Sequence, residues 1–530
     1  MAELVLLIDN LSVALPTGAD RPMALHNISL QLHAGQTLCV VGESGSGKSV
    51  LATTIMGLLD AELKVAGGSL KLQGESLLDA SQARLRSLRA RAMGMVFQEP
   101  MTALNPVMRC GEQIDELLRT HTRDSASQRR AAVLHMLAQV RLPEPERMWH
   151  SYPHQLSGGQ RQRIVIAMAM VMKPALLICD EPTTALDVTT QKDILQLIQT
   201  LQQETGSAVL FITHDMGVVA DIADQVLVMH RGEAVELGSR EQVLHSPQQA
   251  YTRDLLAAVP SMTPPPARHI ADTPPLLRAV SLGKTYDSAW GQAVSTRALH
   301  DASLSLRAGE TVGIVGESGS GKSTLARCVL RLVDPSSGDI FWGDDEIATL
   351  PEAGLRPLRH RVQVVFQDPN RSLNPRMTVG ESLIEGARNF GMSRAEAITL
   401  AEQLLLQVQL PVQAMTRYPR QFSGGQRQRI AIARALACRP QVLVADEAVS
   451  ALDVSVQAQI LQLLRQVQQQ YGLGLLFITH DLRVAAQLCD SVIVMHQGEI
   501  VERGDTAMLY AQPQHAYTQA LMASAPGAAA

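Results

Sequence analysis

The chain has 530 residues, of which 46% are hydrophobic and 18% are charged, and its formal net charge is −5. This length exceeds what one hydrophobic core usually organises, so we expect two to four domains. The hydrophobic content excludes a mainly disordered chain. The slight negative charge argues against a general nucleic-acid binder, because such proteins usually present a strongly positive surface.

The sequence predicts neither a covalent framework nor a membrane span. Its six cysteines are scattered without a close pair, which disfavours a disulfide scaffold or a Cys-x-x-Cys metal site and fits a reducing cytoplasm. The N-terminal residues lack the basic region of a signal peptide. The longest charge-free apolar stretch, Ile164 to Met172, is far shorter than the roughly 20 residues that a spanning helix needs. Any membrane role is therefore expected to be peripheral, through partners.

A glycine-rich loop follows a strand predicted over Thr37–Val41. The loop satisfies the P-loop pattern G-x-x-x-x-G-K-[ST] and opens a predicted helix, which is the context that the pattern requires. In such a loop the backbone N–H groups surround the phosphates, the lysine reaches the outer phosphates and the serine binds Mg²⁺. The expected ATP-binding residues are Gly42, Glu43, Ser44, Gly45, Ser46, Gly47, Lys48, Ser49 and Val50.

Two acidic residues end the strand predicted over Ala175–Cys179. A buried strand of an α/β sheet delivers side chains at its C-terminal edge, where such sheets bind ligands. Asp180 is expected to hold Mg²⁺ through water, and Glu181 to orient or deprotonate the water that attacks ATP. The pattern is weak alone, but a P-loop earlier in the same chain makes it strong.

Further short elements complete an α/β layering in this half. A helix is predicted over Gln191–Gln203, a strand over Ala208–Thr213, and a hairpin whose first strand is Val226–His230 and whose turn is Arg231-Gly232. Continuous apolar runs bounded by glycine or aspartate are typical of buried parallel strands.

A proline-rich segment, residues 260–275, follows the first half. It holds six prolines in sixteen residues, and proline clusters favour extended, semi-rigid spacers that reach ~3.1 Å per residue, or up to roughly 50 Å here. We interpret it as a linker between a domain of residues 1–259 and a domain of residues 276–530. The alanine-rich end after Pro526 is expected to fray.

The second half repeats the first. The offset between the copies is 274 at the P-loop lysines and 266 from Ser157 and Ser423 onward, so the second copy is eight residues shorter before that point. Only a duplication explains a match of this length. The second P-loop is Gly316, Glu317, Ser318, Gly319, Ser320, Gly321, Lys322, Ser323 and Thr324, and the second acidic pair is Asp446 and Glu447. The repeated strands are expected over Thr311–Val315, Gln441–Ala445, Gly474–Thr479 and Val492–His496, and the repeated helix over Gln457–Gln470.

Two further segments resemble the signature of the ATP-binding-cassette (ABC) family, and that resemblance covers nearly the whole chain outside the linker and tail. It implies an α/β fold with two ABC-type P-loop NTPase domains. Each would have a RecA-like α/β core, an antiparallel β subdomain and a helical subdomain, roughly residues 99–156 and 368–422. The signature residues are Ser157, Gly158, Gly159 and Gln160 in one copy, and Ser423, Gly424, Gly425 and Gln426 in the other.

The family resemblance also implies how the two copies work together. In the family two domains pack head to tail, so that each ATP lies between one P-loop and the opposite signature. This implies an intrachain cassette dimer in which Lys48 works opposite Ser423, and Lys322 opposite Ser157. A serine hydroxyl and glycine N–H groups at a helix N-terminus suit a γ-phosphate.

The resemblance assigns further roles, residue by residue. Gln98 and Gln367 match the loop that senses the γ-phosphate, contacts Mg²⁺ and touches the transporter. His214 and His480 match the switch histidine, which joins the lysines and glutamates as a catalytic group. Asp187 and Asp453 match the loop that crosses the dimer interface, and Tyr286 matches the adenine-stacking aromatic residue. The expected Mg²⁺ set is Ser49, Gln98 and Asp180 in the first copy and Ser323, Gln367 and Asp446 in the second.

Two positions depart from the family pattern. Leu15 stands where the second copy has Tyr286, which predicts a weaker adenine contact at the first site, since base–aromatic stacking contributes ~1–3 kcal/mol. Ala448 follows the second acidic pair where Pro182 follows the first, but both acids survive. Both sites are therefore expected to hydrolyse ATP.

Two classes of function remain open at this stage. Twin-cassette translation factors act on ribosomes, but they typically carry a long basic helical linker, whereas this linker is short and nearly uncharged. Residues 97–106, 152–155, 180–191, 246–252 and 512–518 instead resemble peptide/nickel import ATPases, similar to the glutathione or microcin C import ATP-binding proteins. That resemblance implies a peripheral ATPase on the cytoplasmic face of the bacterial inner membrane. Its implied partners are two transmembrane permease subunits and, indirectly, a periplasmic or lipid-anchored solute-binding protein, with no nucleic acid. The cargo stays open among peptides, glutathione and nickel or a metallophore.

Overall fold

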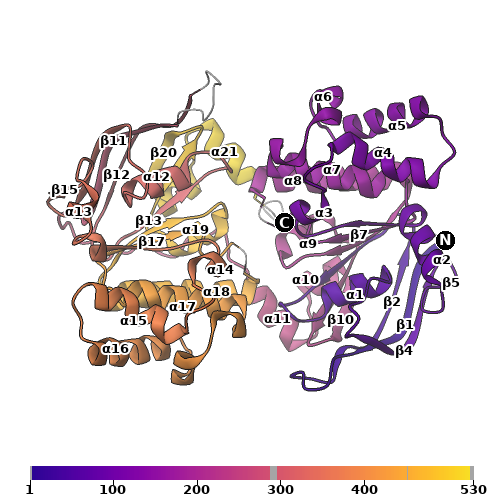
Figure 1. Ribbon diagram of the computed structural model, residues 1–530, viewed down its shortest axis with the longest axis horizontal. Helices are drawn as coiled ribbons and strands as arrows, with labels where there is room; N and C mark the ends of the chain where they lie inside the picture. The colour runs from indigo at the N-terminus through magenta and orange to yellow at the C-terminus, as the bar shows by residue number, and fades with distance from the viewer. Residues whose placement is uncertain (1–2, 185, 287–294, 451, 526–530) are drawn as a thin grey trace. The chain divides into compact units, whose positions relative to one another are not determined.

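The computed structural model describes residues 3–184, 186–286, 295–450 and 452–525. The alanine-rich end after Pro526, for which the sequence predicts fraying, lies outside these residues. The chain divides into two compact units, with the main division between Val259 and Pro260 (Figure 1).

The core of the N-terminal unit is a six-stranded sheet. Five neighbouring strands are parallel, in the order β9-β3-β8-β7-β6, and β10 pairs antiparallel with β9 at the edge. All residues of β3 and β8 are buried, as expected of apolar strands covered on both faces. The strands are β3 (Thr37–Val41), β6 (Met93–Val96), β7 (Leu176–Asp180), β8 (Ala208–Ile212), β9 (Gln225–His230) and β10 (Glu233–Ser239).

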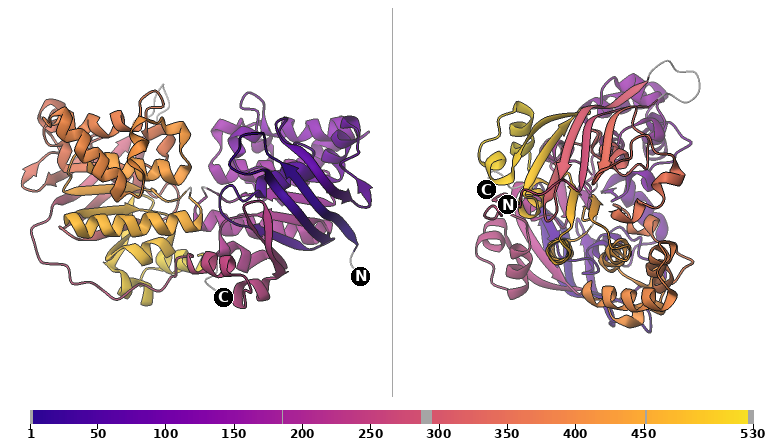
Figure 2. Two further views of the ribbon diagram at one scale, coloured as in Figure 1. Left: turned by 90° about the horizontal axis from the view of Figure 1, so that it is seen from below. Right: turned by 90° about the vertical axis from the view of Figure 1, so that its left-hand side faces the viewer.

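A second, antiparallel sheet forms a separate layer, drawn as indigo strands in Figure 2. Its order is β2-β1-β4-β5, and its apolar face shares a hydrophobic core with helix α1 (Lys48–Ile55) and the central sheet. Burial of this face fixes the strand register, because a one-residue slip would turn the apolar side chains to solvent. The strands are β1 (Leu4–Ala14), β2 (Met23–His33), β4 (Lys64–Leu72) and β5 (Glu75–Ser76).

A helical layer joins the N-terminal unit between β6 and β7, where the family resemblance predicts a helical subdomain. Serine caps begin several of its helices: Ser125 and Ser157 each form a capping box with a glutamine three residues later. The helices of this layer are α3 (Pro100–Ala103), α4 (Cys110–His121), α5 (Ala126–Gln139), α6 (Pro145–His150), η1 (Pro153–Gln155) and α7 (Gly158–Met170). The other helices of the unit are α2 (Gln82–Arg91), α8 (Val188–Thr205), α9 (Met216–Ile222), α10 (Arg240–His245) and α11 (Ala250–Ala257).

The C-terminal unit repeats this architecture. Its sheets have the orders β16-β17-β18-β13-β19-β20 and β12-β11-β14-β15. The strands are β11 (Leu277–Tyr286), β12 (Thr296–Leu306), β13 (Thr311–Val315), β14 (Ser337–Trp342), β15 (Asp345–Glu346), β16 (Val362–Val365), β17 (Val442–Asp446), β18 (Gly474–Ile478), β19 (Ser491–His496) and β20 (Glu499–Asp505). The helices are α12 (Lys322–Val329), α13 (Glu352–Leu355), η2 (Arg359–Arg361), α14 (Pro369–Ser372), α15 (Val379–Asn389), α16 (Arg394–Gln407), η3 (Val412–Thr416), η4 (Pro419–Gln421), α17 (Gly424–Leu436), α18 (Val454–Tyr471), α19 (Leu482–Leu488), α20 (Thr506–Ala511) and α21 (Ala516–Ala523).

The expected fold class is confirmed: each unit has a parallel α/β core, an antiparallel β layer and a helical layer. The strands predicted from the apolar runs agree with the structure to within one residue at each end. The predicted long helices are each three residues short at their N-termini, because α8 and α18 begin at Val188 and Val454. Among the helices of the described residues, none combines the length and the apolar character that a membrane span requires.

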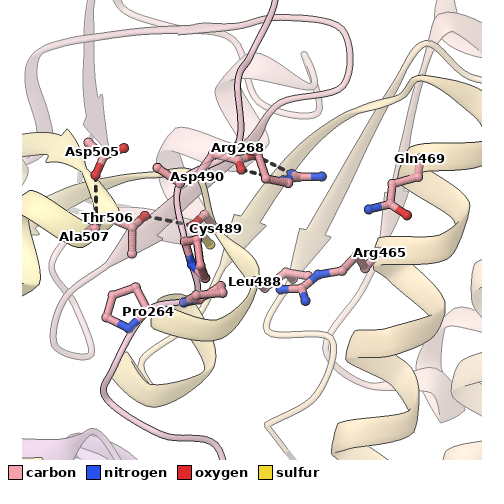
Figure 3. A pocket seen from close by; sticks show the side chains of 13 residues that line it. Pro264, Arg268, Arg465, Gln469, Leu488, Cys489, Asp490, Asp505, Thr506 and Ala507 are labelled. Carbon is pink, nitrogen blue, oxygen red and sulfur yellow. Dashed lines mark hydrogen bonds and ion pairs between the residues drawn. The ribbon is translucent and has the colours of Figure 1, made fainter.

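The proline-rich linker has no helix or strand, but it is not a free spacer. Side chains of the C-terminal unit hold it: the Gln487 amide donates to the carbonyls of Ser261 and Thr263 at 2.9 and 2.8 Å. Arg268 donates to the Asp490 carboxylate through Nε at 2.9 Å and Nη2 at 2.7 Å (Figure 3). The reach of roughly 50 Å estimated for a detached linker therefore requires these bonds to break.

Replacing Arg268 by Ala should loosen the linker. The variant leaves Asp490, whose carboxylate is mostly buried, without its cation, so we expect the linker bonds to weaken by about 1–2 kcal/mol. Limited proteolysis and hydrogen exchange over residues 260–275 measure the effect. Arg297→Ala, which removes an exposed arginine of β12, is the control. Equal protection of the linker in both variants would contradict the anchoring role of Arg268.

Candidate nucleotide-binding and catalytic sites

The shape of each P-loop depends on two glycines at which a Cβ atom would collide with backbone carbonyls. Gly42 has φ +147°, and a Cβ atom there would lie 2.1 Å from the carbonyl oxygen of Met229 on β9. Gly47, before α1, has φ +103°, and its Cβ would lie 2.8 Å from the carbonyl oxygen of Ala24. The loop is thus wedged between the hairpin strand β9 and the outer strand β2. The second unit repeats both contacts, at Gly316 with Met495 and at Gly321 with Ala298.

The P-loop lysine is buried and held by its own loop. The Lys48 ammonium donates to the carbonyls of Gly42 and Glu43 at 2.7 and 2.9 Å, and Lys322 makes the equivalent bonds at 2.8 and 2.6 Å. Burial lowers the pKa of Lys322, against the opposing effect of nearby acids. The cation at the first residue of a helix, together with a glycine-formed cradle that a Cβ would fill, fits a polyphosphate.

The expected Mg²⁺ ligands meet beside this cradle. The Ser49 hydroxyl donates to Oδ1 of Asp180 at 3.3 Å, and Ser323 donates to Asp446 at 3.4 Å. Burial raises the pKa of both aspartates above the ordinary value, and a divalent cation would offset the cost of keeping them charged. Hydroxyl and carboxylate oxygens are the ligands that Mg²⁺ prefers, so the donor set fits that ion.

A histidine, a glutamine and a glutamate form a second cluster at the same sheet edge. Oε2 of Glu181 lies 3.3 Å from Nδ1 of His214 and accepts from the Gln98 amide at 3.1 Å. In the second unit, Glu447 lies 3.5 Å from His480 and accepts from Gln367 at 2.8 Å.

The electrostatics of this cluster keep the glutamates ionised. Burial alone would raise the pKa of Glu181, but the hydrogen bond and charge of His214 bring the pKa below its ordinary value, and His480 does the same for Glu447. Burial lowers the pKa of His480, but Glu447 raises it more, and the result lies above the ordinary value. An ionised carboxylate is what general-base catalysis requires.

Both glutamates also adopt an uncommon backbone conformation. Their φ angles are +48°, in the left-handed region that non-glycine residues rarely occupy. Such conformations persist where the surroundings enforce them and they concentrate at functional sites. Here a backbone hydrogen bond to the neighbouring strand holds each glutamate in this conformation. The N–H of Glu181 donates to the carbonyl of Ile212, and that of Glu447 donates to the carbonyl of Ile478.

The signature serines lie at the N-termini of long helices. The Ser157 hydroxyl accepts from the N–H of Gln160 at 3.3 Å and caps α7, and Ser423 caps α17 in the same way. These capping bonds tie each signature to its own helix. Ser157 and Ser423 are exposed, so their hydroxyl groups are accessible to a ligand. Asp453 stands at the N-cap position of α18.

The structure reveals loop contacts that the sequence did not predict. The Arg21 guanidinium donates to the carbonyl of Gly45, in the first P-loop, at 2.5 Å. The phenol oxygens of Tyr251 and Tyr517 accept from the N–H groups of Glu43 and Glu317. The two tyrosines lie in residues 246–252 and 512–518, which resemble import ATPases, but that resemblance gave them no role. No sequence pattern pointed to Arg21.

The two residues that the sequence predicts at the adenine end, Tyr286 and Leu15, have different surroundings. Tyr286 ends β11 with 38% of its surface exposed, and the Lys284 ammonium lies 5.1 Å from its ring centroid. Leu15 instead packs against the hydrophobic core beneath the outer sheet. A partly buried leucine that packs against the core offers no aromatic ring on which a base could stack.

Comparison with known proteins identifies the family. The ABC transporter family matches residues 25–184 and 299–450, and the family described as the oligopeptide/dipeptide transporter C-terminal region matches residues 235–289 and 501–530. The chain belongs to the ABC transporter family and is one of its ATP-hydrolysing subunits. It carries two cassettes, each followed by the oligopeptide/dipeptide C-terminal region.

Similar curated relatives match over nearly the whole length. The glutathione import ATP-binding protein GsiA of Escherichia coli (strain K12) is 46% identical over 561 residues, which cover 98% of this chain and 89% of that protein. The protein of the same name from Salmonella typhimurium (strain LT2) is 46% identical over 557 residues, with the same coverage. Among solved structures, the dimeric post-hydrolysis state of the ATP-binding cassette MJ0796 bound to ADP and Pi is 30% identical. It covers 44% of this chain and 98% of that chain, with a TM-score of 0.40.

Replacing Gly42 by Ala should damage the first site through its backbone. The added Cβ would overlap the Met229 carbonyl, and the alanine backbone would have to keep an unfavourable φ. We therefore expect a loss of about 3 kcal/mol or more in stability. Gly206→Ala is the matched control, because Gly206 has φ +70° with open space around its Cβ, and it should lose only about 1–2 kcal/mol. Urea unfolding midpoints compare the two. Equal losses would show that the Met229 contact does not constrain the loop.

Proposed function

We propose that this chain energises the import of short peptides, glutathione among them, by hydrolysing ATP at two sites. The observation that carries the proposal is the completeness of both sites: each brings a buried P-loop lysine, a serine–aspartate pair and a histidine-paired glutamate to one sheet edge. The 46% identity to the glutathione import ATP-binding proteins over 98% of the chain supports the cargo class. It also favours import over action on ribosomes.

The geometry of each site supports the following residue roles. Lys48 and Lys322 leave their loop carbonyls to bind the outer phosphates, while the P-loop N–H groups surround them. Mg²⁺, when bound, neutralises charge on those phosphates, and Ser49 with Asp180, or Ser323 with Asp446, holds it. Glu181 and Glu447 accept the proton of the attacking water, and His214 and His480 keep them ionised and oriented.

We further propose that the two cassettes close on each other to complete each site. The exposed signature serines, Ser157 and Ser423, would then contact the γ-phosphate held by the opposite P-loop. Gln98 and Gln367, now bonded to the glutamates, would exchange that bond for Mg²⁺ and move the helical layers attached to them. Asp187 and Asp453 lie on the loops that would cross the interface.

The same proposal defines the surroundings of the chain. Residues 1–259 and 276–530 form the two cassettes, and residues 260–275 join them. The chain docks on two transmembrane permease subunits at the cytoplasmic face of the bacterial inner membrane. A periplasmic or lipid-anchored solute-binding protein delivers the cargo to those permeases, and nucleic acid has no part.

Replacing either catalytic glutamate by Gln should remove about half or more of the ATP turnover. Glu181→Gln and Glu447→Gln each disable one site, and the double variant should lose about 100-fold, the usual minimum for general-base catalysis. Phosphate release measures turnover, and Glu241→Gln, which changes a surface carboxylate with 81% exposure, is the control. Full turnover by either single variant would contradict two competent sites.

The cargo is tested by uptake in cells that lack this chain. Restoring the chain should restore accumulation of radiolabelled glutathione and of a dipeptide, and the double glutamine variant should restore neither. Accumulation of nickel alone, with no glutathione or peptide uptake, would overturn the proposed cargo class while leaving the ATPase assignment intact.

A further inference from the structure

One tyrosine near the end of each cassette contacts the P-loop of the same cassette. Tyr251 is the second residue of α11, and Tyr517 is the second residue of α21. The backbone N–H of Glu43 donates to the Tyr251 hydroxyl at 3.3 Å, and that of Glu317 donates to Tyr517 at 3.1 Å. Both tyrosines lie in the region that matches the oligopeptide/dipeptide transporter C-terminal family. The duplication has thus kept this contact twice.

The peptide group that donates to the tyrosine also holds the catalytic lysine. The carbonyl of Gly42 and the N–H of Glu43 belong to one planar peptide unit and point in opposite directions. That carbonyl accepts from the Lys48 ammonium at 2.7 Å, so the unit is fixed at both ends. In the second cassette, Gly316 and Glu317 contribute the same unit, with Lys322 at 2.8 Å.

Each tyrosine is itself held firmly. The Tyr251 ring packs on His230 with centroids 4.2 Å apart, and the Tyr517 ring packs on His496 at 4.0 Å. Both histidines directly follow the methionines whose carbonyls fill the space beside the first P-loop glycine. Burial raises the pKa of Tyr517 to about 12, so the hydroxyl keeps its proton at neutral pH.

A carboxylate fastens the start of each tail helix to the hairpin. Glu236 on β10 accepts from the N–H groups of Gln248 and Gln249, at 2.8 and 3.2 Å. Glu502 on β20 accepts from Gln514 and His515, at 2.8 and 3.0 Å. A continuous set of contacts therefore runs from the tail, through the tyrosine, to the peptide that holds the P-loop lysine.

From these contacts we infer that Tyr251 and Tyr517 are positioning residues of the two nucleotide sites. Each hydroxyl orients the peptide after the first P-loop glycine, and thereby sets the phosphate cradle, and the position of the lysine before ATP binds, in that cassette alone. The C-terminal region of this transporter class then contributes to ATP binding rather than only extending the fold. The inference rests on the proposed function insofar as the two P-loops bind ATP.

The test measures ATP affinity one site at a time. Lys322→Ala disables the second site, and in that background Tyr251→Phe should weaken ATP binding at the first site about 10-fold, because it leaves a P-loop N–H without its acceptor. Tyr517→Phe in the Lys48→Ala background should weaken the second site by a similar factor. Isothermal titration calorimetry gives both dissociation constants.

Two controls separate positioning from general support of the fold. Tyr517→Phe in the Lys322→Ala background should leave ATP affinity at the first site unchanged. Tyr517 contacts the second P-loop, whose site the Lys322→Ala change has already disabled. Tyr510→Phe removes a hydroxyl that donates to the Leu482 carbonyl at 2.6 Å, away from the P-loop, so it should lower the melting temperature without changing affinity. A Tyr→Phe effect on melting alone, or equal effects on both sites, would overturn the inference. If the Lys48→Ala/Lys322→Ala double variant still bound ATP, the proposed function would fail instead.

Discussion

The carbonyl group of Met229, and of Met495 in the second cassette, occupies the space that a Cβ atom of the first P-loop glycine would need. This contact fixes where the loop leaves its buried strand, and the rest of the site depends on it. The loop carbonyls that hold the lysine, the serine that meets the aspartate, and the start of the P-loop helix all follow within a few residues. Because the methionines lie on the hairpin strands β9 and β19, the hairpin and the tail that packs on it become part of the nucleotide site.

Each cassette therefore brings distant parts of the chain to one sheet edge. The P-loop follows β3, the acids end β7 and the histidine follows β8, three neighbouring strands of the parallel sheet. Parallel strands deliver their C-terminal ends to the same edge, which places a cation, two acids and a histidine together in a buried setting. Burial there lowers the pKa of Lys322 and raises those of Asp180 and Asp446, while a histidine in each cassette keeps the glutamate ionised. The two cassettes match closely in this chemistry and differ at the position where adenine contact is proposed, which is Leu15 in one and Tyr286 in the other.

The sequence could predict those features that depend on local patterns. Apolar runs such as Thr37–Val41 identified the buried strands, and the spacing of glycines identified the P-loops, because both signals lie within a few consecutive residues. The long-range hydrogen bonds could not be predicted. The bonds from the Glu43 N–H to Tyr251 and from Gln98 to Glu181 join residues far apart in the chain, and nothing in their local sequence specifies the partner. The linker contacts could not be predicted for the same reason. Its proline content predicts an extended chain, but not the Arg268–Asp490 ion pair that anchors it.

The proposal that the signature of the opposite cassette completes each ATP site can be tested by one measurement. The Glu181→Gln/Glu447→Gln variant should hold ATP without hydrolysing it, so 8-azido-ATP can be crosslinked and the labelled peptides mapped by mass spectrometry. Adding Ser423→Arg places a bulky cation in the second signature. If the proposal holds, labelling is lost from the adenine end of the site that contains Lys48, near Leu15, and kept at that of the site that contains Lys322, near Tyr286. Loss at Lys322 with labelling kept at Lys48 would contradict it.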